Sequence, residues 1–297
     1  MKEDLVLPAP REKSAGADGE PLLEVSGLVK HFPVKGGFPI RRTVGAVQAV
    51  DGVDITVHAG ESFGLVGESG CGKSTTGRLI TRLLEPTGGK ITYRGQDISH
   101  ANRKQLAPIR SEIQMIFQDP YSSLNPRQTV GKIISGQKEL GIAFVFIAHD
   151  LAIVRHFSQR VAVMYLGKII EVGDRESIYT RPRHPYTHAL LSAVPEVNLA
   201  TDDATARERI RLAGDVPSPI SPPSGCRFRT RCWKAQDKCA TEEPPLVRIS
   251  GNHDGHLTAC HFPEEPTIEA RDEDIVLDPA LAALEEGTPG PEPAQEA

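Results

Sequence analysis

The feature that most constrains the fold is a glycine-rich loop between a short apolar run and an amphipathic segment. The run Ser62 to Val66 is typical of a buried strand, and Thr75 to Leu84 of a helix with one apolar face. The loop between them, Gly-Glu-Ser-Gly-Cys-Gly-Lys-Ser at 67–74, matches G-x-x-x-x-G-K-[ST] in the strand-to-helix context that the pattern requires. A strand, a glycine loop and a helix in this order predict a βα unit and an α/β fold.

The residue types of this loop suit a phosphate site. Glycines let the loop curl so that backbone N–H groups point at phosphate oxygens, and the helix dipole adds positive potential at the same place. Lys73 is expected to bridge the β- and γ-phosphates, Ser74 to offer its hydroxyl to Mg²⁺, and Thr75 to add a phosphate contact. The predicted nucleotide-binding set in the loop is Gly67, Ser69, Gly70, Gly72, Lys73, Ser74 and Thr75. A glycine turn that only closes a strand is the alternative interpretation.

Apolar patterning places further elements around this unit. Alternation from Leu22 to Val57, with a turn at Asp51-Gly52, predicts an antiparallel β-layer, and the runs 113–117 and 144–148 predict buried parallel strands. Frequent prolines and four cysteines after Arg181 indicate a smaller second domain at 181–262, following a first domain at 21–180. Residues 1–20 and 263–297 have compositions typical of disordered tails.

Charge and hydropathy exclude some classes of function. The net charge of −5 combines an acidic end, with eleven acids and one base from Glu264 onward, and a mildly basic body. That surplus suits an anionic nucleotide but is too small to predict a nucleic-acid-binding surface. The longest apolar run, at 141–148, is too short to span a bilayer, and no secretory signal is evident, so we expect a cytoplasmic protein.

Two motifs together carry a family resemblance. The loop through Thr75, followed by Ile-Phe-Gln-Asp-Pro-Tyr-Ser-Ser-Leu-Asn-Pro-Arg at 116–127, resembles the ATP-binding subunits of peptide and nickel ABC importers. The resemblance covers about residues 22–262 and is closest to the second of the two paired ATP-binding subunits. It implies an ABC cassette, ATP and Mg²⁺ as ligands, and ATP-driven peptide import as the function.

The resemblance also implies roles for particular residues. Gln118 corresponds to the Q-loop glutamine that contacts Mg²⁺ and the attacking water, and residues 119–127 to the part that touches the permease. His149, at the end of the 144–148 strand, corresponds to the switch histidine that senses the γ-phosphate. Phe32 falls where the family stacks an aromatic ring on adenine, although a core aromatic is the alternative there.

The family also supplies expectations about assembly. The segments His-Pro-Tyr-Thr at 184–187 and Gly214 to Cys226 resemble the C-terminal extension of the peptide-importer branch; the alternative is a proline-rich connector that packs on the cassette. Expected partners are a second ATP-binding subunit, membrane permease subunits and, indirectly, a peptide-binding protein. The expected location is the cytoplasmic face of the inner membrane.

One part of the family pattern is missing. Relatives carry a helical subdomain, a Leu-Ser-Gly-Gly-Gln signature and a strand ending in Asp-Glu between the Q-loop and the switch histidine, but here thirty residues separate Gln118 from His149. Helices average about 11 to 12 residues, so these elements do not fit. We interpret this as an internal deletion with its junction near residues 135–138. Hydrolysis should then be near background, and 144–148 should either end the sheet or pair with 113–117.

The cysteines form a separate candidate site. Cys226, Cys232, Cys239 and Cys260 have a spacing similar to that of peptide-importer ATPases that hold a [4Fe–4S] cluster, and stable disulfides are not expected in the cytoplasm. We therefore expect the four sulfurs to converge within ligation distance, with four unligated thiols as the alternative. His253, His256 and His261 are candidate substitute ligands.

Two rival functions follow from these observations. The missing carboxylates favour a non-catalytic nucleotide-binding or assembly protein left by an internal deletion. A phosphate-loop kinase of small molecules is weaker, because nothing in the sequence supplies an acceptor site.

Overall fold

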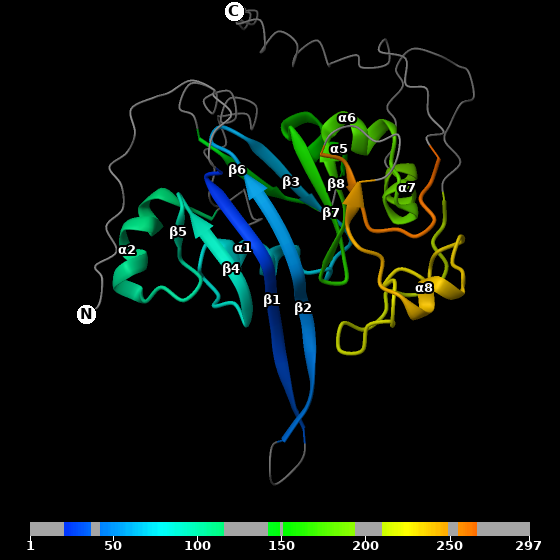
Figure 1. Ribbon diagram of the computed structural model, residues 1–297, viewed down its shortest axis with the longest axis horizontal. Coiled ribbons are helices and arrows are strands. Elements are labelled where there is room, and N and C mark those ends of the chain that lie inside the picture. Colours follow the sequence, from blue (N-terminus) through cyan, green and yellow to red (C-terminus); the bar gives the residue numbers. More distant parts are fainter. Residues whose placement is uncertain are drawn as a thin grey trace, which may run out of the picture.

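The structure is a computed structural model that describes residues 21–36, 42–115, 142–148, 151–193, 210–248 and 255–265. These residues form two β-sheets with helices packed on them (Figure 1). The antiparallel sheet has the order β2-β1-β4-β5, with strands β1 (Leu23–Gly36), β2 (Arg42–Val57), β4 (Gly88–Tyr93) and β5 (Gln96–Asp97). The second sheet has the order β6-β3-β7-β8-β10-β9, with strands β3 (Ser62–Val66), β6 (Phe144–Ile147), β7 (Arg160–Tyr165), β8 (Lys168–Asp174), β9 (Val247–Arg248) and β10 (Leu257–Thr258). The described helices are α1 (Lys73–Ile80), α2 (Arg103–Glu112), α5 (Leu151–Phe157), α6 (Arg175–Thr180), α7 (Pro185–Ser192) and α8 (Asp237–Thr241).

The second sheet has a parallel centre. Strand β3 lies between β6 and β7 and is parallel to both, whereas β7, β8, β10 and β9 continue the sheet in antiparallel pairs. The sheet therefore combines a parallel P-loop unit with antiparallel additions, and the expected α/β class with an antiparallel β-layer is confirmed.

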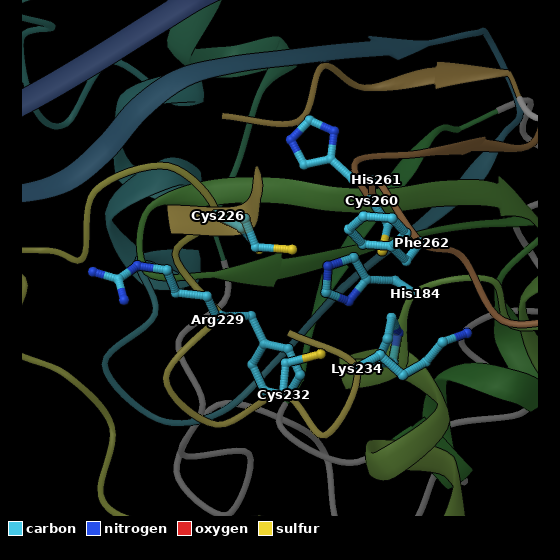
Figure 2. A pocket seen from close by; sticks show the side chains of 11 residues that line it. His184, Cys226, Arg229, Cys232, Lys234, Cys260, His261 and Phe262 are labelled. Atoms are coloured by element: carbon cyan, nitrogen blue, oxygen red, sulfur yellow. The ribbon is translucent and has the colours of Figure 1, made fainter. Parts of the chain in front are cut away.

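The C-terminal segment, which comprises the described residues 210–248 and 255–265, joins this sheet. Strand β10 pairs with β8, where Leu257 lies opposite Val172, and β9 pairs with β10. The segment also brings its four cysteines around one small cavity beside α7 (Figure 2). Of the tail expected at 263–297, residues 263 and 264 are half-buried, and the Glu264 N–H donates to the Arg183 carbonyl oxygen over 2.8 Å. The remainder of that tail, and residues 1–20, lie outside the described residues.

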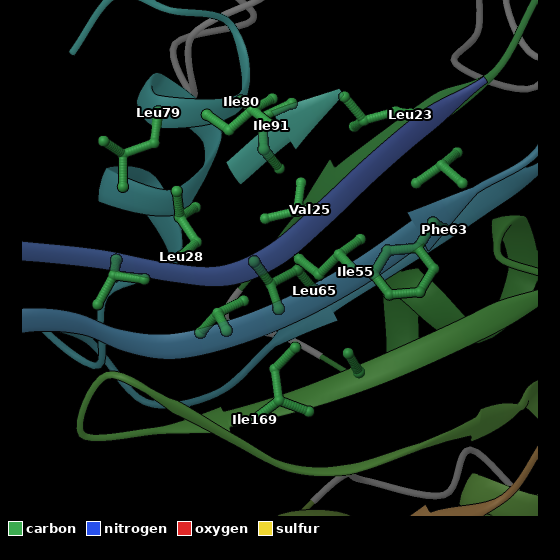
Figure 3. Close-up of a cluster of buried hydrophobic side chains, with 14 of the residues drawn as sticks. Leu23, Val25, Leu28, Ile55, Phe63, Leu65, Leu79, Ile80, Ile91 and Ile169 are labelled. Atoms are coloured by element: carbon green, nitrogen blue, oxygen red, sulfur yellow. The ribbon is translucent and has the colours of Figure 1, made fainter. Parts of the chain in front are cut away.

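Strand alternation divides the apolar side chains between two cores. Phe63 and Leu65 of β3 face the antiparallel sheet and α1, in a cluster that includes Val25, Ile55 and Leu79 (Figure 3). On the opposite face of the six-stranded sheet, a second cluster packs against α5, α6 and α7 and contains Val66, Val161, Val163, Tyr165, Ile178, Tyr186 and Phe228. With Val66 beside Leu65, the two faces of β3 are both covered, which agrees with its continuous apolar run.

Three local expectations are wrong. Asp51 and Gly52 lie within β2 rather than in a turn between strands. Helix α1 ends at Ile80 instead of Leu84, because Arg82 has φ 53° and its Nε donates to the Ile98 carbonyl oxygen over 2.7 Å; Leu83 is 51% exposed as a result.

The expected strand at 113–117 also needs correction. Residues 113–115 are not a strand, and 116–117 lie outside the described part. Among the described residues, β6 is at the end of its sheet with β3 as its neighbour, and its four side chains are half-buried. Of the two arrangements expected from a missing neighbouring strand, pairing with 113–117 is not seen for residues 113–115.

Candidate functional site

The glycine loop leads from β3 into α1 and is wound around the Lys73 ammonium. Lys73 is the first residue of α1, and its buried Nζ donates to the carbonyl oxygens of Gly67 at 2.6 Å and Glu68 at 2.8 Å. Gly67 and Gly72 have φ values of 147° and 111°. A Cβ on Gly67 would lie 2.2 Å from the Met164 carbonyl oxygen, so this approach of backbone to backbone requires glycine.

The loop forms one wall of a cavity of about 400 Å³, which is within the range of ligand pockets. Six of the seven predicted loop residues line it, namely Ser69, Gly70, Gly72, Lys73, Ser74 and Thr75. Gly67 contributes its carbonyl oxygen to Lys73 instead. The other walls include Phe32, Ala148 and Pro219, from three distant parts of the chain.

The cavity has a positive character. The amino end of α1 and the Lys73 ammonium both border it, and its described lining contains no aspartate or glutamate. The side chain of Cys71, within the loop, is buried, and burial raises the pKa of its thiol, so the thiol is uncharged at neutral pH. The site therefore suits an anion and offers no carboxylate base among the described residues that line it.

Phe32 lies at the edge of this cavity and outside both apolar cores. It is half-buried on β1, opposite Val47 of β2, which also lines the cavity. The Lys30 ammonium lies 5.2 Å from the centre of its ring. Of the two interpretations of Phe32, the structure places the ring where a ligand contact is possible.

The two predicted catalytic residues, Gln118 and His149, lie outside the described residues. The chain that leads to His149 is described, and Ile147 and Ala148 line the cavity at the carboxyl end of β6. The roles of both residues therefore stay predictions.

Tyr186 and Arg231 clamp the phosphate loop through Glu68, a contact that the sequence did not predict. The Glu68 N–H donates to the Tyr186 hydroxyl over 2.9 Å, and Arg231 Nη1 donates to the two Glu68 carboxylate oxygens over 2.9 and 3.2 Å. Tyr186 belongs to the His-Pro-Tyr-Thr motif on α7, and this motif is the sequence feature that could have indicated the contact. The proline-rich extension does pack on the cassette, and it does so at the loop itself.

The four cysteines line one small cavity. Cys226, Cys232, Cys239 and Cys260 border a space of about 10 Å³, which holds about one water molecule. No three histidine, cysteine, aspartate or glutamate side chains in the described ranges are grouped so that they can hold a metal ion. The four cysteines thus share one cavity, whereas the expected convergence of their sulfurs within ligation distance is absent from the described residues, and a cluster does not fit the space as it stands.

Burial controls the chemistry of these thiols. It raises the pKa of Cys232 to about 11 and that of Cys260 to about 12, with the neighbouring cysteines adding to both shifts. In Figure 2 the sulfur atoms of Cys226 and Cys232 and the imidazole of His184 turn toward the same space. As packed here, the thiols of Cys232 and Cys260 are protonated at neutral pH.

Of the three candidate histidine ligands, His261 lines the cysteine cavity, whereas His256 pairs with a buried carboxylate. His256 Nε2 lies 2.8 Å from Oε1 of Glu171, a fully buried carboxylate that also accepts from the backbone N–H groups of Arg183 and His184. His261 Nε2 lies 3.1 Å from the Glu242 carbonyl oxygen, and His253 lies outside the described residues. The role of His256 is therefore to pair with a buried carboxylate.

Comparison with known proteins finds matching family models and relatives. The family model of ABC transporters matches residues 50–204, and that of the oligopeptide/dipeptide transporter C-terminal region matches 170–239. The chain is 38% identical to the probable peptide ABC transporter ATP-binding protein y4tS of Sinorhizobium fredii, over 323 aligned positions that cover 81% of this chain and 89% of the relative. It is 36% identical to the dipeptide transport ATP-binding protein DppF of Escherichia coli, covering 81% and 94%. Among solved structures, cbiO1 from Clostridium perfringens superposes on 55% of this chain and 92% of its own, with a TM-score of 0.43 and 18% identity.

The phosphate loop, the two-sheet fold and the match over half of the chain define a P-loop ATPase of the ABC transporter family. Within that family, the chain belongs to the ATP-binding proteins of peptide, dipeptide and oligopeptide transporters. No helix in the described residues is long and apolar enough to cross a membrane.

Proposed function

We propose that this chain binds Mg²⁺-ATP in the cavity between Phe32 and Lys73, as the ATP-binding subunit of a peptide importer. The observation that carries the proposal is the cavity of about 400 Å³ with the loop, the α1 amino end and a buried ammonium on one side and an aromatic ring on another. The loop N–H groups and Lys73 would bind the phosphates, Phe32 the adenine, and Ser74 the metal. Bound Mg²⁺ neutralises charge on the phosphate oxygens.

The names of the relatives support a place in a transport complex. Homologues are called peptide, dipeptide and oligopeptide transport ATP-binding proteins. We propose a second ATP-binding subunit and membrane permease subunits as partners at the cytoplasmic face of the inner membrane, with residues 119–127 meeting the permease. A peptide-binding protein would act indirectly, and Gln118 and His149 would take the Q-loop and switch roles.

Hydrolysis by this chain alone is proposed to be near background. Its alignment with y4tS runs over 323 positions, more than the 297 residues of the whole chain, yet takes in only 81% of it. This supports a segment of the relatives that has no counterpart here, as the thirty residues between Gln118 and His149 predict. Loss of a general base costs about 10²- to 10⁴-fold in rate. A nucleotide-binding protein without turnover is therefore the second candidate function.

One comparison tests both candidates. The full chain and Lys73→Ala are titrated with Mg²⁺-ATP by calorimetry, and phosphate release is followed in parallel. Removing charge-assisted bonds worth about 1.5 to 3 kcal/mol should weaken binding about 10- to 150-fold. The exposed Lys104 on α2 provides the control, and Lys104→Ala should bind as the unmodified chain does. Phosphate release that disappears in Lys73→Ala would show a working ATPase and exclude the non-catalytic candidate.

The cysteine site has two proposed states. The spacing favours a [4Fe–4S] cluster, while the packing, with about 10 Å³ of free space, favours four thiols. Anaerobic incubation with iron and sulfide, followed by visible absorption and iron analysis, separates them. A cluster would appear in the unmodified chain and be lost in Cys232→Ser; four free thiols by thiol titration, with no bound iron, would support the second state.

A further inference from the structure

The nucleotide cavity has a wall that comes from the C-terminal segment. Pro219 lines the cavity together with Phe32, although 187 positions separate them in the sequence. We propose that Pro219 forms the second wall of the base site, so that the C-terminal segment sets the affinity for the base of the nucleotide. This inference rests on the proposed binding of ATP in the same cavity.

Backbone hydrogen bonding holds Pro219 at this position. Strand β2 is at the end of its sheet, and its residue Gln48 donates its outward N–H to the Pro219 carbonyl oxygen over 2.9 Å. Gln48 pairs with His31, directly beside the pair of Phe32 and Val47. The loop at Pro219 thus covers the sheet edge next to the aromatic ring.

A buried arginine holds the same segment from its other end. Arg227, whose side chain is 8% exposed, donates from Nη2 to the Gln48 side-chain oxygen over 2.8 Å. It also forms an ion pair with Asp51 of β2 and donates to the Leu166 carbonyl oxygen. Two attachments to β2, one at each end of the stretch 219–227, give the wall a defined position before any ligand arrives.

The chemistry of the two walls defines what they can recognise. A phenyl ring and a pyrrolidine ring offer apolar faces, which suit the flat face of a nucleobase. Neither ring reads the hydrogen-bonding edge of a base. The wall should therefore add affinity for any purine nucleotide and none for a phosphate chain that lacks a base.

Pro219→Gly tests this with a matched control. The change removes the ring but keeps the carbonyl oxygen that accepts from Gln48. Pro217→Gly is the control, because Pro217 is also half-buried in the same loop but is not among the residues that line the cavity. Both variants lose the same backbone restraint when proline is replaced by glycine. Binding of Mg²⁺-ATP and of inorganic tripolyphosphate is measured by calorimetry for both variants and the unmodified chain.

The expected result is about fivefold weaker ATP binding in Pro219→Gly, which corresponds to losing about 40 Å² of apolar contact. Tripolyphosphate binding should not change, and Pro217→Gly should match the unmodified chain for both ligands. Equal ATP affinity in the two proline variants would overturn the inference, as would an equal loss for tripolyphosphate. Absence of ATP binding by the unmodified chain would instead refute the proposed function on which the inference rests.

Discussion

Replacing Glu68 by glutamine tests whether the C-terminal segment stabilises the phosphate loop. The carboxylate accepts two hydrogen bonds from Arg231, whose side chain is 9% exposed, while that of Glu68 is 25% exposed. Removing one partner of a buried ion pair costs about 3 to 5 kcal/mol, whereas surface pairs contribute at most about 1 kcal/mol. This pair lies between the two cases, so Glu68→Gln should lower the free energy of unfolding by about 2 kcal/mol.

Urea denaturation measures this loss, and a second variant identifies its cause. Arg231→Met keeps a long side chain but removes the charge. The Glu68 carboxylate that remains can still reach water, so this variant should lose less free energy of unfolding than Glu68→Gln does. The double variant should be more stable than the sum of the two single losses predicts, since the buried charge is then gone. Additive losses, or a Glu68→Gln variant within about 0.3 kcal/mol of the unmodified chain, would refute the clamp as a source of stability.

Two further predictions concern stability. Gly72→Ala should destabilise the fold by more than about 3 kcal/mol, because its Cβ would lie 2.1 Å from the Ala49 carbonyl oxygen at φ 111°. Gly70→Ala, where φ is 79° and the space is open, should cost only about 1 kcal/mol. Equal losses of the two variants in thermal unfolding would contradict this. Burial lowers the pKa of His184 from 6.5 to about 4, so the unfolded chain binds more protons between these values and stability should fall by up to about 3 kcal/mol as the pH drops through that window. His184→Asn keeps an acceptor for the Tyr186 N–H and should reduce this pH dependence; an unchanged pH profile would contradict the assignment.

The elements that the sequence predicted well are those set by local pattern. The strand at 62–66, the loop at 67–74 and the strand at 144–148 follow from apolar runs and glycine spacing, and the structure contains all three. The end of α1 was not predictable, because it depends on a hydrogen bond from Arg82 to the distant Ile98 carbonyl oxygen.

The candidate site shows the same division. Six loop residues line the cavity as their spacing predicts, since a contiguous motif brings its own geometry. Pro219 and Arg231 reach the site through tertiary packing, and no short-range signal in the sequence connects either residue to the loop. The cysteine spacing predicted a common cavity but not the orientation of the thiols within it, which depends on how closely α7 and the C-terminal strands pack.

The bonds from Lys73 to the carbonyl oxygens of Gly67 and Glu68 hold the phosphate loop in one conformation. With the Lys73 ammonium at its centre, the loop is ordered by the protein's own hydrogen bonds, so its conformational entropy is lost during folding rather than during binding. The ammonium has three N–H donors, and two of them bond these carbonyl oxygens, so the third, which lies 3.5 Å from the weak acceptor Cys71 Sγ, can turn to a phosphate oxygen. The loop is therefore preorganised, and an incoming anion can bind to it without first ordering the chain.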